Sequence, residues 1–267
     1  MQKKVQRIAA GLFIGAFTMM AQGPVPTAAE AASPLPPGAL SKANLAKQRP
    51  KPPFDLTGTW QHGGGQNNGF RFTPPANLKL TPAAQKEMDA YTAAQKIGKV
   101  YHDDIGACWP AGLPIIMTRV WPIAMVQGPT AIYMISGFMN SVRTVFLDGR
   151  PHTDPDLVVR SFNGESIGHW DGDTLVVDTT GFVDDHHWID NGLVATDALH
   201  VVERMKLLNN ANTLEIEYTF EDPKSFEGKF SSTKRFRRME DTDITEASCL
   251  PDLNAHMPST HSQVNVR

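Results

Sequence analysis

The stretch Ser166–Arg204 decides the fold class of this chain; it reads SIGHWDGDTLVVDTTGFVDDHHWIDNGLVATDALHVVER. Two segments of strand composition, Ile167–Trp170 and Thr174–Thr179, flank the dipeptide Asp171-Gly172, which is typical of a tight hairpin turn. A third strand is expected at Leu199–Leu207. Because four of the nine histidines also lie in this stretch, strand pattern and titratable side chains coincide here. We therefore look here first for both the sheet and a chemical site.

The alternation that marks strands continues on both sides of this stretch. One face of the next strand carries Leu214, Ile216, Tyr218 and Phe220, and the residues between them are Glu or Thr. Further strands are expected at Phe54–Trp60, Val142–Leu147, Ser231–Arg238 and Ile244–Ser248. The pattern predicts about seven to ten short strands.

One helix interrupts the strands, at Leu80–Gly98. Thr81 is a good N-cap, Pro82 fits the first helical position, and Gly98 fits the position just past the end. Its apolar residues form a narrow stripe, so we expect the helix to pack on the outside of a sheet. Many short strands with one helix favour an antiparallel barrel or a sandwich.

The start of the strand region favours the barrel. Phe54–Trp60 ends in Gly58-Thr59-Trp60, which resembles the G-x-W pattern at the start of lipocalin-like barrels. We therefore expect residues 54–249 to form a mainly β, lipocalin-like antiparallel β-barrel, with the helix packed outside. A barrel of this size can hold one small ligand in its interior.

Three motifs resemble a large family of secreted bacterial proteins, most of which have no assigned function. They are GHWDGDTLVVDTTGF at 168–182, WID at 188–190 and LHVVER at 199–204. The family reads G-x-W-x-G-D-T-L-V-V-D-T-x-G-F, W-L-D and H-V-T-E-R, and it has segments similar to Cys108–Pro114, Phe146–Arg150 and Cys249. The chain departs from it by one extra residue in Val183–Trp188 and in the tail after Cys249. The resemblance implies secretion and names no reaction.

Residues 1–31 have the organisation of a secretory signal peptide. A basic start with Lys3, Lys4 and Arg7 precedes the apolar run Ile8–Ala21, and Ala29–Ala31 is a plausible cleavage motif. An uncleaved anchor is the alternative, although the run is short for a bilayer span. Residues 32–53, rich in Pro and Ala, indicate a linker, and 250–267 a flexible tail. A periplasmic or secreted protein is expected.

The charge of the chain restricts its partners. Removal of residues 1–31 changes the net charge from −3 to −5, and Lys234–Arg238 is the single basic run. A negative net charge with a single basic run does not fit nucleic-acid binding. The sequence has no phosphate-binding loop, dinucleotide fingerprint or serine-nucleophile motif. We expect a small hydrophobic or aromatic ligand, no cofactor and no stable membrane insertion.

Cys108 and Cys249 are the two cysteines. In an exported protein an even count favours a disulfide. The bridge would close a loop of about 140 residues and stabilise the fold by roughly 4 kcal/mol. Two free buried thiols are the alternative.

Glu203 is the most informative single residue, because alternation places it on the face of Leu199, Val201, Met205 and Leu207. A carboxylate on an apolar face must be paired, protonated or at a cavity, since burial of an unpaired charge is costly. A structural ion pair with Arg143 or Arg160 is one interpretation. A general acid or base with a raised pKa is the other.

The segment after the hairpin is crowded with Asp184, Asp185, His186, His187 and Asp190. Such a segment is either a solvated loop or a proton-transfer site. We expect His200 and Glu203, helped by His187 and Asp190, to shuttle a proton in a cofactor-independent lyase, hydratase or isomerase. A binding protein without chemistry is the alternative. A metal-dependent hydrolase, with His186 or His187, His200 and Glu203 as ligands, is a second alternative.

Overall fold

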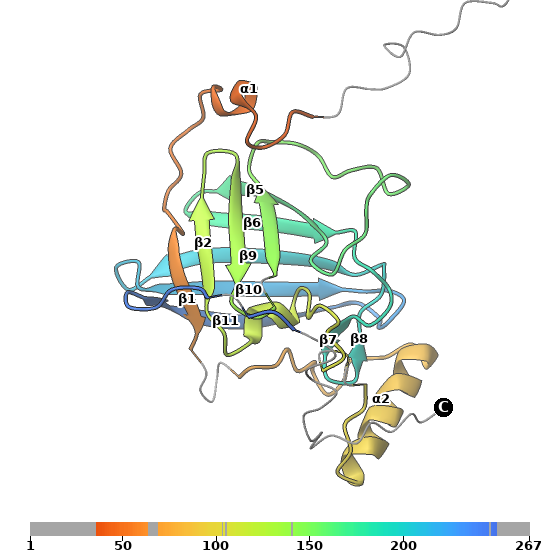
Figure 1. Ribbon diagram of the computed structural model, residues 1–267. Coiled ribbons are helices and arrows are strands. Elements are labelled where there is room, and N and C mark those ends of the chain that lie inside the picture. Colours follow the sequence, from red (N-terminus) through yellow and green to blue (C-terminus); the bar gives the residue numbers. More distant parts are fainter. Residues whose placement is uncertain are drawn as a thin grey trace, which may run out of the picture. The chain divides into compact units, whose positions relative to one another are not determined.

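Nine strands of the described chain close into a barrel in the order β1-β11-β10-β9-β6-β5-β4-β3-β2 (Figure 1). The structure, a computed structural model, describes residues 36–63, 69–102, 104, 106–139, 141–245 and 247–249. All elements belong to the unit that begins at Pro37. The barrel strands are β1 (Gly58–His62), β2 (Ile123–Gln127), β3 (Ala131–Ser136), β4 (Val142–Phe146), β5 (Glu165–Asp171), β6 (Thr174–Thr180), β9 (His200–Leu208), β10 (Thr213–Glu221) and β11 (Lys229–Met239). The other elements are α1 (Lys42–Leu45), α2 (Pro82–Lys96), the 3₁₀ helix η1 (Ile115–Thr118), β7 (Trp188–Asp190) and β8 (Leu193–Val194).

The predicted mainly β barrel is confirmed, with one difference in strand direction. Strands β4 and β5 run parallel, with Val145 opposite Ser166 and Phe146 opposite Ile167. A long connection, residues 147–164, joins them, so β5 can enter the sheet in the same direction as β4. Short turns impose antiparallel pairing, whereas a long connection does not. The barrel is therefore mixed, because eight of its nine strand pairs are antiparallel.

The barrel interior is filled by the apolar faces of the alternating strands. On β10, Leu214, Ile216, Tyr218 and Phe220 are fully buried, as the alternation predicts. Trp60 lies in the same core, and its indole N–H donates to the carbonyl of Leu56 at 2.8 Å. Aromatic side chains thus occupy space that a larger barrel would leave open.

Helix α2 begins and ends where the sequence predicts. The Thr81 hydroxyl accepts a hydrogen bond from the backbone N–H of Ala84, and Gly98 after the helix has φ +69°. The helix lies outside the barrel and packs against the β7–β8 ribbon (Figure 1). The ribbon turn approaches closely at Gly192, where a Cβ atom would lie 2.8 Å from the Tyr91 ring. The helix and the ribbon therefore form a unit beside the barrel.

Near the two ends of the chain, one predicted strand needs correction, the expected linker contains a helix, and two predictions fall outside the described residues. The strand expected at Ile244–Ser248 is wrong: its described residues form no strand, because β11 ends at Met239. The segment expected as a linker contains α1, whose buried Asn44 donates to Asp148 at 2.8 Å. The predicted signal peptide and the tail from 250 lie outside the described residues. Among the described helices, none is long and apolar enough to cross a membrane.

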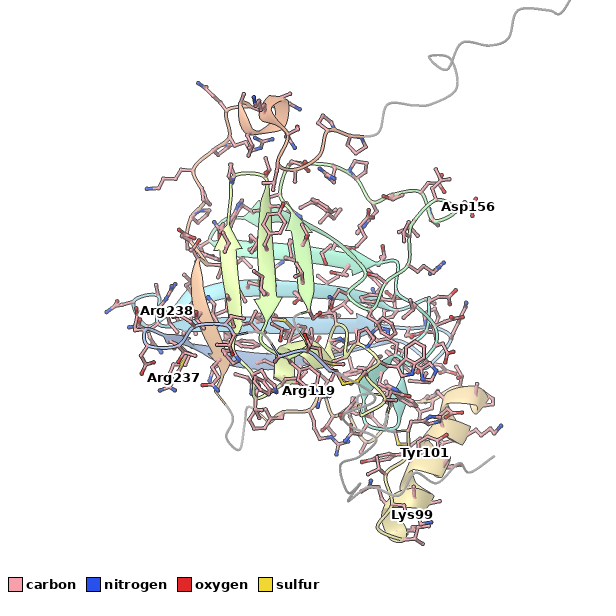
Figure 2. All side chains as sticks on the ribbon, viewed as in Figure 1. Lys99, Tyr101, Arg119, Asp156, Arg237 and Arg238 are labelled. Atoms are coloured by element: carbon pink, nitrogen blue, oxygen red, sulfur yellow. A yellow bond between two sulfur atoms is a disulfide. The ribbon has the colours of Figure 1, made fainter. Side chains whose placement is uncertain are left out.

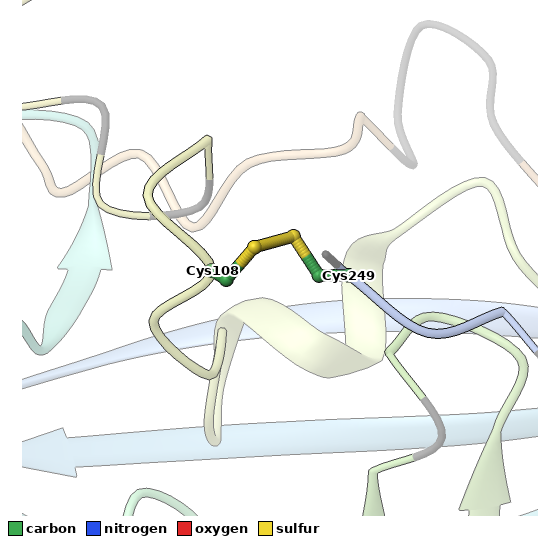
Figure 3. Close-up of a disulfide and its surroundings, with 2 residues drawn as sticks. All are labelled: Cys108 and Cys249. Atoms are coloured by element: carbon green, nitrogen blue, oxygen red, sulfur yellow. A yellow bond between two sulfur atoms is a disulfide. The ribbon is translucent and has the colours of Figure 1, made fainter. Parts of the chain in front are cut away.

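The predicted disulfide joins Cys108 to Cys249 (Figure 3). The two Cα atoms lie 5.6 Å apart, and 141 positions separate the residues in sequence. The bridge ties the segment that precedes η1 to the chain that follows β11. The bridge therefore holds these two segments next to each other.

Candidate functional site

Glu203 forms an ion pair inside the barrel. Arg143 donates to both of its carboxylate oxygens: Nη1 reaches Oε1 at 3.0 Å, and Nη2 makes the second bond, with Oε2. The side chains of Arg143 and Glu203 are 3% and 0% exposed, so the pair is shielded from water. Arg143 also donates to the hydroxyls of Ser166 and Thr179, each at 3.1 Å. This geometry matches the structural interpretation of Glu203, with Arg143 and not Arg160 as its partner.

Tyr218 lies directly opposite Glu203 in the neighbouring strand. Its hydroxyl is buried and makes no hydrogen bond to the described residues. Burial, together with the nearby Glu203 carboxylate, raises the pKa of Tyr218 well above its usual range. The phenol is therefore neutral at ordinary pH, and this part of the core holds a single matched pair of charges.

His200 lies on the outer wall of the barrel and not beside Glu203. Three positions separate the two residues along β9, which places their side chains on opposite faces of the strand. His200 Nε2 lies 2.9 Å from Asp178 Oδ2, and this contact raises the pKa of His200. The other oxygen of Asp178 lies 2.9 Å from His152 Nε2. His200 and Glu203 therefore face no common cavity in this structure, which the predicted proton shuttle would require.

His187 and Asp190 each have a separate partner below the barrel. His187 is 1% exposed and its Nε2 lies 2.6 Å from the carbonyl oxygen of Leu113. Burial lowers the pKa of His187 to about 4, so the ring is neutral and donates this bond. Asp190 accepts from Arg71 Nε at 3.0 Å. The structure thus brings none of the four predicted site residues together with another.

A different histidine and carboxylate do meet. His186 Nδ1 lies 2.7 Å from Asp104 Oδ1, and the indole N–H of Trp188 donates to Asp104 Oδ2 at 2.6 Å. The His186 ring is stacked on Trp109, with ring centroids 4.0 Å apart and planes 7° from parallel. Trp109 covers one face of the His186 ring, and Asp104 holds Nδ1. Nε2 lies 3.6 Å from Oδ1 of Asp185, whose side chain is 85% exposed, so Nε2 is the nitrogen that can meet a ligand. We call His186 and Asp104 the dyad.

The backbone around the dyad is held in an uncommon conformation. His102, Cys108 and His186 all have positive φ, at 50°, 65° and 54°. This region of conformational space is costly for residues with a side chain, and such residues cluster at functional sites. The Cys108–Cys249 bridge and the bond from the N–H of Trp109 to the carbonyl of Asp104, at 2.8 Å, hold the segment in place.

Two hollows meet at Asp104 of the dyad. The first, of about 340 Å³, is lined by Glu87, His102, Asp104, His186 and Trp188 among others. The second, of about 260 Å³, shares His102, Asp104 and Trp188, and extends to Tyr91, Tyr101 and Arg119. Their shared residues come from the chain after α2 and from β7. The candidate site therefore lies between α2, the ribbon and η1, outside the barrel interior.

Sequence reasoning identified His186 as part of the crowded loop and missed Asp104. The signal was the run His102-Asp103-Asp104, which lies between the helix and Cys108. A disulfide predicted at Cys108 was a reason to expect this polar run to be ordered. What the sequence could not show is that Asp104 lies next to His186, 82 positions further on.

Comparison with protein-family models and with curated proteins finds no match for this chain. Within the described part of the chain, no group of three or more His, Cys, Asp or Glu side chains is arranged to hold a metal ion. The site is therefore interpreted from its own geometry.

Proposed function

We propose that this protein is a cofactor-independent acid–base enzyme, of the lyase, hydratase or isomerase type, that acts on a small molecule at the dyad. The observation that carries the proposal is the contact of 2.7 Å between His186 and Asp104 beside a hollow of about 340 Å³. This proposal replaces the four residues expected from the sequence with two others, His186 and Asp104.

The dyad has the two parts that a general base requires. Asp104 accepts the Nδ1–H of His186, which leaves the lone pair on Nε2 to remove a proton from a bound molecule. The imidazolium that results is stabilised by the same carboxylate. Trp188 holds the second oxygen of Asp104, so the carboxylate cannot rotate away. The side chain of His186 is 29% exposed, which leaves it accessible from the hollow.

A general-base probe tests this proposal without knowledge of the natural substrate. The ring of 5-nitrobenzisoxazole opens when a base removes its C–H proton, and the phenolate product is coloured. We expect turnover by the protein, and a loss of about 100-fold or more in His186→Gln, the range assigned to one proton-transfer group. Asp104→Asn should also lower the rate, because the amide can stabilise the wrong tautomer of the imidazole.

The matched control is His200→Gln, which removes a histidine from the outer wall of the barrel. This variant should keep the wild-type rate, because His200 pairs with Asp178 and not with either hollow. Equal rates for wild type and His186→Gln would remove the acid–base proposal. If a ligand still binds in the hollow beside His186, the alternative function, a binding protein without chemistry, would then apply.

We also propose that the chain is exported to the periplasm or beyond and that its mature form begins near Ala32. The basic and then apolar N-terminus supports this, and so does the Cys108–Cys249 bridge, since disulfides persist in oxidising compartments. N-terminal sequencing of the protein from a periplasmic extract tests the proposal. Recovery of only full-length chain in the cytosol would overturn it.

A further inference from the structure

Arg119 is a half-buried guanidinium without a counter-ion. In the part of the chain that the structure describes, its side chain makes no hydrogen bond or ion pair, and its Nε is buried. The nearest described interaction is with the Phe138 ring, whose centroid lies 5.8 Å from Cζ. Burial lowers the pKa of Arg119, which reflects the cost of removing its charge from water. An arginine stays protonated under all ordinary conditions, and a bound anion would relieve this cost.

The neighbouring carboxylates form no ion pair with Arg119, although Oδ2 of Asp190 is buried without a hydrogen-bond partner among the described residues. Asp104 receives His186 and Trp188 on its two oxygens. One oxygen of Asp190 accepts from Arg71 at 3.0 Å and from the backbone N–H of Asn191 at 2.8 Å. Asp190 raises the pKa of Arg119 through space but does not approach it closely enough for an ion pair. The donors of Arg119 therefore remain available to a bound molecule.

Arg119 lines the hollow of about 260 Å³, together with a set of aromatic rings. The rings of Tyr101 and Trp188 lie 6.5 Å apart at 78°, and those of His102 and Trp188 lie 5.5 Å apart at 40°. The Tyr101 hydroxyl donates to Glu87 at 2.6 Å, which fixes the ring of Tyr101 in place. In Figure 2, Arg119 is labelled below the middle of the barrel, and Tyr101 is labelled lower, beside α2.

We propose that this hollow, the Arg119 pocket, binds a small aromatic carboxylate, with the carboxylate on Arg119 and the ring packed against the cluster of Tyr101, His102 and Trp188. A guanidinium offers two parallel N–H donors to a carboxylate, which gives both charge and planar geometry. Aromatic walls favour a flat ring in edge-to-face contact. A pocket of this volume suits one ring with short substituents.

The inference rests on the proposed function, since it names the substrate class of the same site. Asp104, His102 and Trp188 line both hollows, so a ring anchored at Arg119 would lie beside the dyad. The part of the ligand that extends from the ring toward His186 would then carry the proton that the dyad removes. Arg119 positions the ligand, and His186 acts on it.

Titration calorimetry with benzoate, and with benzamide as its neutral analogue of equal shape, tests the ligand class. We expect the full-length chain to bind benzoate at least tenfold more tightly than benzamide. Arg119→Gln should weaken benzoate binding by about 10- to 100-fold and leave benzamide binding unchanged, because a charged hydrogen bond is lost. Arg119→Lys, which keeps the charge but not the paired donors, should lie between the two.

The matched control is Arg237→Gln, a substitution of the same kind at an exposed position of β11, which should leave benzoate binding unchanged. Thermal unfolding of each variant shows whether it is folded. Equal affinity for benzoate and benzamide in the wild type, or wild-type benzoate affinity in a folded Arg119→Gln, would overturn the inference. Undetectable benzoate binding at millimolar concentration would overturn it too.

The two proposals can fail separately. A protein that binds benzoate through Arg119 but does not turn over 5-nitrobenzisoxazole keeps the ligand class and loses the acid–base chemistry. A protein that turns over the neutral probe through His186, but shows no preference for benzoate over benzamide, keeps the chemistry and loses the ligand class.

Discussion

Replacing Glu203 by Gln should destabilise the protein by about 3–5 kcal/mol, because it leaves the Arg143 charge buried without its partner. The side chains of Arg143 and Glu203 are 3% and 0% exposed, so water cannot take the place of the lost carboxylate. The hydroxyls of Ser166 and Thr179 remain as acceptors for Arg143, but neither carries a charge. For a domain of this size the midpoint of thermal unfolding should fall by roughly 10 °C.

Urea unfolding followed by fluorescence measures the loss. The matched control is Glu227→Gln, the same substitution in a surface pair: Glu227 lies 3.3 Å from Lys79, and both side chains are more than 70% exposed. We expect less than about 1 kcal/mol there, since exposed ion pairs contribute little. The control shows that the chemistry of the substitution alone does not cause the effect.

A double-mutant cycle separates the stranded charge from the loss of packing. Arg143→Met alone should also be strongly destabilising, because it leaves the Glu203 carboxylate buried and unpaired. The double variant Arg143→Met/Glu203→Leu should be much more stable than the sum of the two single changes, because hydrophobic replacement of a buried pair is often neutral. If Glu203→Gln costs less than about 1 kcal/mol, or if the two single effects add, the buried pair is not what holds Glu203 in place.

Three further outcomes follow from other contacts. Folding lowers the pKa of His187 from 6.5 to about 4, so the unfolded chain binds a proton at this residue at a higher pH than the folded chain does. The free energy of unfolding should therefore fall as the pH decreases from 6.5 to 4, by up to about 3 kcal/mol. Urea unfolding at several pH values measures this fall, and an equally steep fall in His187→Gln would contradict the prediction. Cys108→Ser/Cys249→Ser should lower stability by about 2–5 kcal/mol and weaken benzoate binding, because the bridge holds the segment beside the dyad; wild-type binding in this variant would separate the bridge from the site. Gly192→Ala should cost more than Gly149→Ala, because both have φ +79° but only Gly192 has neighbours within 4 Å, and thermal unfolding of the pair provides the comparison.

The features predicted correctly from the sequence are those that depend on nearby residues. The hairpin at Asp171-Gly172, the ends of α2 and the inward direction of Glu203 follow from turn chemistry, capping and alternation. The parallel pairing of β4 with β5 could not be predicted this way, because it depends on where a long connection returns. The ribbon β7–β8 was missed because strands of three and two residues give no periodic signal.

The candidate site was harder to predict because its parts come from distant segments. Asp104 and His186 lie on opposite sides of most of the barrel strands in sequence, and only the closed fold brings them together. His200 and Glu203 were expected to be partners because they are close in sequence. They are three positions apart on one strand, and residues an odd number of positions apart point to opposite faces of the sheet. The Arg119 pocket could not be predicted, because a missing counter-ion is a property of the folded chain.

The first and last strands of the barrel are paired with each other: Trp60 of β1 lies opposite Arg238 of β11. The ring therefore cannot close until nearly the whole chain is available, and the contacts that close it have a very long sequence separation. Such a topology is expected to fold slowly, because the entropy of closing a long loop is lost before the contacts form. Any chain stopped before β11 would expose two strand edges, at β1 and β10, and open edges of this kind promote aggregation. Strand β11 must therefore be present before the edges of β1 and β10 are protected from pairing with another chain.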